Sequence, residues 1–215
     1  MNIIWHGLSC FSIDSKKLQN NFTLVIDPYE NSTGLKLPRA LTAHMTAVSH
    51  NEADANNVKA VQGDPFVISM AGEYEVGGVF VYAINADRKA EGKGRRNLLF
   101  IVEAEDMRVA HLGALDRALT DKELEGLQNV DILMLPVGGK DVMTPKVASE
   151  VIGQVEPRVV IPMNHAVPGL KEKSGTADTF CKELGVCRRE DANKYKVARK
   201  DLPEEDMLVM VLSKA

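Results

Sequence analysis

The sequence contains little that would place the protein in a membrane or outside the cell. Its apolar runs, such as Thr23–Ile26 and Asp131–Pro136, are far shorter than the ~20 residues that cross a bilayer. The N-terminal residues also lack the basic segment and the long apolar segment of a secretion signal. We therefore expect a cytoplasmic protein with no membrane partner.

Cysteine is scarce as well. The chain has three cysteines, Cys10, Cys181 and Cys187, and their spacing matches no zinc motif. Disulfides are rare in the cytosol, where thiols are kept reduced. We therefore expect three reduced thiols.

Positive charge is in deficit, with 26 Lys and Arg against 30 Asp and Glu and a net charge of −4. No overall basic field draws such a chain to nucleic acid. The hydrophobic share of 45% and the charged share of 26% are typical of a globular protein. Because no low-complexity segment or composition shift marks a boundary, we predict a single domain over residues 1–215.

Short apolar or β-branched runs predict a strand-rich first half. The predicted strands are Asn2–Trp5, Cys10–Ile13, Phe22–Ile26, Met45–Ser49, Phe66–Ser69, Asn97–Ala104 and Met107–Leu112. Tyr74–Ile84 is either one strand with a bulge at Gly77-Gly78 or a hairpin. Glu105-Asp106 separates two strands that we expect to form a hairpin.

The second half alternates predicted strands and helices. Thr120 and Glu123 form a capping box that predicts a helix to about Gln128. Thr144-Pro145 predicts a second helix start, and a third helix runs from Thr176 to Gly185. The predicted strands between and after the helices are Asp131–Leu135, Arg158–Met163 and Met207–Leu212. This order indicates an α/β layered domain.

Polar residues follow four of the predicted strands, where layered α/β folds carry their functional loops. His50 begins the first of these segments, and Asp87 ends the second. His111 opens the third, and the fourth ends at His165. These segments are the candidate sites.

Several motifs, in this order and spacing, resemble those of one known family. They are Trp5-His-Gly-Leu-Ser-Cys-Phe11, Val25-Ile-Asp-Pro28, Val48-Ser-His50, Gly72-Glu-Tyr-Glu-Val-Gly-Gly-Val79, His111-Leu-Gly113, Pro136-Val-Gly-Gly139 and Val160-Ile-Pro-Met163. The chain resembles the metallo-β-lactamase superfamily, in the branch of predicted zinc-dependent hydrolases related to L-ascorbate-6-phosphate lactonase. The resemblance implies an α/β fold, the four-layer αββα sandwich with two mixed β-sheets.

The resemblance also implies a pair of zinc ions held by a His-x-His-x-Asp-His signature. Here that run holds His50, Glu52, Asp54 and Ala55, so the first His and the Asp are kept. Glu52 can still offer an oxygen to a metal, whereas Ala55 offers nothing. Two of the four signature ligands are therefore unchanged, one is replaced by a possible ligand and one is lost.

The remaining ligand positions implied by the resemblance are also substituted. Ala86 stands where the family has a His, Ala114 where it has a bridging Asp, and Asn164 where it has the closing His. His165 follows one place late, and adjacent side chains on a strand point to opposite faces. We treat His165 as a ligand only if its side chain swings inward.

The supporting residues are clearer. Asp27 would orient a metal-binding His in the family, and here it is expected to bond to backbone or to His50. His111 is expected to lie behind the site or in the core. His6 and His44 are predicted to be structural.

We derive three functional hypotheses. The first is a degenerate two-metal site with little or no hydrolase activity, no bound cofactor, and a binding or regulatory role toward an unknown small molecule, protein or second copy. The second is a lactone or phosphoester hydrolase with a single zinc or manganese at His50, Glu52 and His165. The third is RNA binding through residues 87–96, whose basic residues are Arg88, Lys89, Lys93, Arg95 and Arg96.

Overall fold

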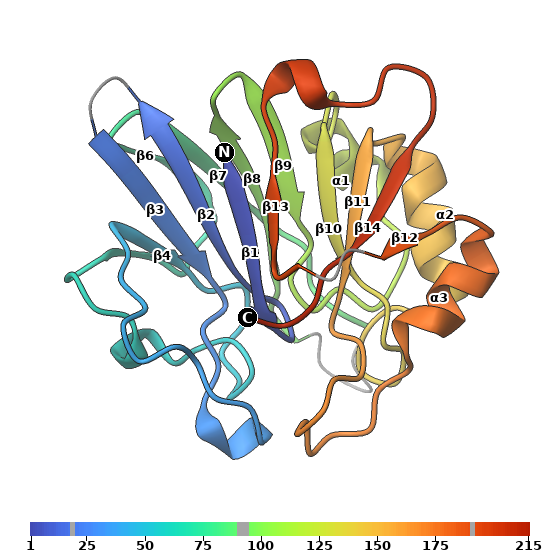
Figure 1. Ribbon diagram of the computed structural model, residues 1–215, viewed down its shortest axis with the longest axis horizontal. Coiled ribbons are helices and arrows are strands. Elements are labelled where there is room, and N and C mark those ends of the chain that lie inside the picture. The colour runs from blue at the N-terminus through green and yellow to red at the C-terminus, as the bar shows by residue number, and fades with distance from the viewer. Residues whose placement is uncertain (18–19, 90–94, 190–191) are drawn as a thin grey trace.

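The computed structural model describes residues 1–215 except 18–19, 90–94 and 190–191. Two β-sheets face each other and run through the molecule side by side, with helices α2 (Pro145–Val155) and α3 (Ala177–Leu184) outside one of them (Figure 1). The chain therefore has the two-sheet α/β architecture that the sequence predicts.

The first sheet has strand order β13-β1-β2-β3-β4-β5. Its strands are β1 (Asn2–Gly7), β2 (Cys10–Lys17), β3 (Asn20–Ile26), β4 (Met45–Ala47), β5 (Phe66–Ile68) and β13 (Lys194–Lys196). Pairing is antiparallel from β13 to β3 and parallel from β3 to β5, so the sheet is mixed.

The second sheet has strand order β12-β14-β11-β10-β9-β8-β7-β6. Its strands are β6 (Gly72–Val76), β7 (Val79–Asn85), β8 (Leu98–Ala104), β9 (Met107–His111), β10 (Ile132–Pro136), β11 (Val159–Met163), β12 (Arg188–Arg189) and β14 (Leu208–Val211). Strands β6 to β9 are antiparallel, and β9 to β12 are parallel.

Three apolar clusters hold the layers together. The largest lies between the sheets and includes Leu24, Phe100 and Ile161. The second packs α2 and α3 onto the eight-stranded sheet. The third cluster includes Val25 of the six-stranded sheet and the loop residues Tyr29, Leu35 and Leu41, near the 3₁₀ turns η1 (Asn31–Thr33) and η2 (Val58–Ala60). This burial of apolar side chains stabilises the sandwich.

Local signals in the sequence are confirmed at most turns and caps. Gly77 and Gly78 both have positive φ, so Tyr74–Ile84 divides into the β6–β7 hairpin and is not one bulged strand. Glu105 and Asp106 turn the β8–β9 hairpin. The capping box of α1 (Asp121–Gly126) is present, and Thr144 and Thr176 cap α2 and α3. The short strands β12 and β13 were not predicted.

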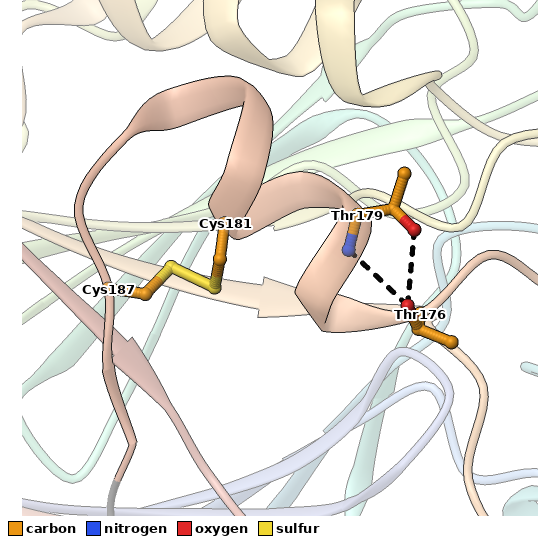
Figure 2. The surroundings of a disulfide bond; sticks show 4 residues. All are labelled: Thr176, Thr179, Cys181 and Cys187. Atoms are coloured by element: carbon orange, nitrogen blue, oxygen red, sulfur yellow. Dashed lines mark hydrogen bonds between the residues drawn. A yellow bond between two sulfur atoms is a disulfide. The ribbon is translucent and has the colours of Figure 1, made fainter.

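Two of the three cysteines contradict the prediction of reduced thiols. Cys181 and Cys187 form a disulfide across the end of α3, whereas Cys10 is buried and free (Figure 2). Gly185 caps the helix in a left-handed conformation and turns the chain back, which brings the two Cα atoms to 5.5 Å. That distance is within the range a disulfide requires. The cytoplasmic location stays a prediction.

None of the helices in the described part of the chain combines the length and hydropathy needed to cross a membrane.

The disulfide should contribute measurably to stability. Closing so short a loop restricts the unfolded chain by about 2 kcal/mol, so Cys187→Ser should lower the free energy of unfolding by that amount. Urea unfolding with and without a reducing agent measures it. The reducing agent should lower the stability of the wild type by the same amount as the substitution does, and it should leave the variant unchanged. A wild-type unfolding midpoint that is the same with and without the reducing agent would contradict the prediction.

Candidate functional site

The three candidate ligands in the loop after β4 do come together. The donor atoms of His50, Glu52 and Asp54 all lie within 4.8 Å of one another. Within this loop, the backbone amides of Ala55 and Asn56 both donate to the Glu52 carbonyl. These two hydrogen bonds fold the segment into a tight turn. This turn aims alternate side chains at one point.

His50 is held in place by a chain of hydrogen bonds. Asp27, fully buried after β3, accepts from the Ser49 amide at 2.7 Å and from its hydroxyl at 2.6 Å. The Ser49 hydroxyl lies 2.8 Å from His50 Nδ1. Asp27 therefore bonds directly to backbone, at the Ser49 amide, and reaches His50 only through the Ser49 hydroxyl. The sequence had left open whether its partner would be backbone or His50.

Asp54 occupies the other ring nitrogen of His50, with Oδ1 at 3.1 Å from Nε2. Burial opposes the charged imidazole, but the bond to Asp54 and the nearby Asp27 carboxylate outweigh it and raise the pKa of His50. Burial likewise opposes ionisation of Asp54, yet the His50 bond leaves the pKa of Asp54 below its ordinary value. Both ring nitrogens of His50 thus have protein partners.

Arg88 is the functional residue that sequence reasoning missed. Its Nη2 donates to Glu52 Oε1 at 2.6 Å, and Arg95 lies 3.6 Å from the same oxygen. The Arg88 side chain is 4% exposed. The available signal is its position directly after Ala86-Asp87, a ligand segment in the resemblance, whereas the sequence alone suggested for Arg88 only a part in an RNA-binding loop. A buried cation therefore sits on one of the three candidate ligands.

The former ligand positions are packed with methyl groups. Ala55, Ala86 and Ala114 are all at most 1% exposed. The Ala114 amide donates to the Asn97 side chain, so its backbone is also engaged. Nothing at these positions could coordinate an ion.

Asn164 and His165 point to different places at the end of β11. Asn164 is buried and lines the same cleft as Glu52 and Arg88. The His165 ring lies 4.6 Å from the ring of Trp5 and lines a different cavity, beside Pro168 and Thr176. The structure does not bring His165 to the other three candidate ligands.

The other histidines serve the fold. His111 is fully buried, with Nε2 at 2.8 Å from the Ser9 carbonyl and Nδ1 accepting from the Gly113 amide. His44 accepts from the Thr23 amide and stacks on Phe22. His6 lies 2.5 Å from the Ser12 hydroxyl.

These groups open into a cleft of about 390 Å³. Its lining includes the basic residues Arg88, Arg95, Lys140, Lys171 and Lys173, together with the acidic residues Glu52, Asp54, Asp141 and Glu172. The segment around η1 and the loop after β11 both line the cleft, and they are in contact where the Lys171 amide donates to the Thr33 carbonyl.

Comparison with known proteins places this arrangement in a family. A β-lactamase superfamily domain matches residues 2–164. The chain belongs to the β-lactamase superfamily. A UPF0173 protein of Pyrococcus abyssi is 27% identical over 205 residues, which cover 86% of this chain and 90% of that protein. A UPF0173 metal-dependent hydrolase of Thermoplasma acidophilum is 25% identical over 192 residues, 77% of this chain and 83% of that one.

A solved structure shows the same fold. A protein of Thermotoga maritima, described as a Zn-dependent hydrolase of the metallo-β-lactamase superfamily, is 29% identical to this chain, with a TM-score of 0.79. The alignment covers 99% of each chain. The finer relationship to L-ascorbate-6-phosphate lactonase stays a prediction.

The residues of this superfamily member do not fit two metal ions. Alanines fill three ligand positions, and Arg88 places a positive charge on Glu52. His50, Glu52 and Asp54 have the donor types and spacing for at most one ion, which would have to compete with Arg88.

Acidification should destabilise the protein through His6. Burial, with a smaller effect of Lys214, lowers the pKa of His6 from 6.5 to about 4. The unfolded chain therefore binds an extra proton between these values, and stability falls as the pH drops from 6.5, by about 2 kcal/mol at pH 5. Urea unfolding at pH 7 and pH 5 measures this loss.

His6→Asn is the matched variant for that measurement. Its amide cannot titrate, so it should lose less stability than the wild type between the two pH values. Equal losses in both proteins would show that His6 is not responsible.

Proposed function

We propose that this superfamily member binds a small ligand in its cleft and has little or no hydrolase activity. The observation that carries the proposal is the contact between the buried Arg88 guanidinium and Glu52. In a metal-dependent hydrolase, the ligand carboxylates face a metal cation. Here one of them faces a cation that the chain itself supplies.

Electrostatics supports this reading. A divalent ion beside Arg88 would meet a like charge on a side chain that is only 4% exposed, which is unfavourable. The methyl groups of Ala55, Ala86 and Ala114 cannot offset that repulsion with new bonds. Without a bound metal, no water in the cleft has the lowered pKa that makes hydroxide available near neutral pH.

The cleft itself supports a binding role. The cleft is open, with a volume of about 390 Å³. Its walls carry charged groups and also apolar ones, such as Leu8 and Val142. This size falls within the range of small-molecule sites.

A second candidate is a hydrolase with one metal, for which the 4.8 Å cluster of His50, Glu52 and Asp54 is the specific support. The names of relatives as metal-dependent hydrolases favour it too. Zinc or manganese would suit one nitrogen and two carboxylate donors. In this case a metal would have to displace Arg88 from Glu52.

RNA binding through residues 87–96 has less support. Residues 90–94, including Lys93, lie outside the described part of the chain. Among the others, Arg88 is buried on Glu52 and Arg95 approaches the same carboxylate. Both residues line the cleft, Arg88 buried and Arg95 exposed.

Metal content and turnover distinguish the two main candidates. Protein purified with added zinc or manganese should retain well under one equivalent by mass spectrometry and should not hydrolyse lactones or phosphodiesters, because the ligands are missing. Glu52→Ala should change neither result. Stoichiometric metal together with turnover, both lost in Glu52→Ala, would refute the proposal and establish the one-metal hydrolase.

A further inference from the structure

Two residues that line the cleft each have a buried side-chain donor with no acceptor among the described residues. The donors are Arg88 Nε and Asn164 Nδ2. Both residues line the cleft, and both are 5% exposed. Leaving a buried donor unpaired costs roughly 1–3 kcal/mol, and more when the group is charged. Two such groups in one cavity suggest an absent acceptor.

The chemistry of these groups identifies the kind of acceptor. Arg88 has five N–H donors in a planar fork, and the side-chain hydrogen bond seen in the described residues is the one to Glu52. A guanidinium matches the paired oxygens of a carboxylate or phosphate. The amide of Asn164 can donate to the same group.

The charges around the cleft point the same way. Asp54 is paired with His50, Glu52 with Arg88, and Lys140 with Glu172 at 2.5 Å. Lys171 and Lys173 line the cleft and have no carboxylate within 4.0 Å in the part of the chain that is described. The excess charge of the cleft is therefore positive, which favours an anion.

We propose that the cleft binds a small molecule through a phosphate or carboxylate group, with Arg88 as the cationic centre where relatives would use metal. This inference rests on the proposed function and names its ligand class. Arg88 and Asn164 bind the oxyanion at the floor of the cleft. Lys171 and Lys173 at the rim attract it.

Glu52 competes with the bound anion for the Arg88 guanidinium. With the cleft empty of anion, the carboxylate keeps the buried guanidinium paired; a bound oxyanion shares or takes over that pairing. This assignment makes opposite predictions for the two partners. Loss of Arg88 weakens anion binding, whereas neutralising Glu52 strengthens it.

Calorimetric titration of EDTA-treated protein with inorganic phosphate and, separately, with citrate tests the assignment at low salt. At least one probe should bind, and Arg88→Gln should weaken its binding at least tenfold. Arg39→Gln, at an exposed arginine outside the cleft, should bind as the wild type does. Glu52→Gln should bind several-fold more tightly, since Arg88 then lacks a charged partner.

The outcomes separate this inference from the proposed function. No binding of either probe at millimolar concentration, or equal binding by Arg88→Gln, would overturn the inference while leaving the metal result untouched. If Arg88→Gln fails to fold, Glu52→Gln decides: tighter binding supports the assignment, and unchanged or weaker binding overturns it. Comparing phosphate with citrate identifies which oxyanion is preferred.

Discussion

The ion pair between Arg88 and Glu52 is the interaction on which the character of the site depends. A guanidinium that is 4% exposed is tolerable only beside a compensating charge, because removing it from water costs several kcal/mol. Arg88 therefore keeps Glu52 in the cleft, and Glu52 keeps Arg88 there. The pair joins the loop after β4 to the connection between β7 and β8, two segments that carry metal ligands in the family resemblance. A monovalent side chain thus supplies positive charge at a site that retains two unchanged ligands, His50 and Asp54.

Apolar packing stabilises the scaffold around this pair. Three apolar clusters pack the two sheets, the outer helices and the loop cover, and burial of this kind dominates stability. The network from Asp27 through Ser49 to His50 and Asp54 is likewise made entirely of protein groups. Alanine at positions where the family resemblance implies metal ligands is consequently compatible with the fold.

Local features of the fold were predictable where neighbouring residues decide them. The Thr120–Glu123 capping box, the Thr144-Pro145 start and the left-handed Gly185 end act within one helical turn, so they can be read directly. The β8–β9 hairpin follows from two adjacent residues at its turn. Strands β12 and β13 contain two and three residues, too few for a periodic pattern, and exist because neighbouring strands pair with them. The prediction of three reduced thiols was wrong because it rested only on the expected reducing environment of the cytosol. That expectation says nothing about the end of α3, which brings Cys181 and Cys187 together.

The sequence by itself determined the superfamily, the order of the elements, and the loss of donors at positions 55, 86 and 114, since these depend on residue identity and spacing. The sequence placed His50, Glu52 and Asp54 in one short loop but left open whether they converge, and the structure brings their donor atoms within 4.8 Å of one another. Tertiary structure alone decided that Arg88 contacts Glu52 across 36 positions, and that Asn164 faces the cleft while His165 packs on Trp5. The physical reason is that a side chain leaving a strand end takes its direction from backbone geometry and from partners on distant segments, neither of which is encoded in its immediate neighbours.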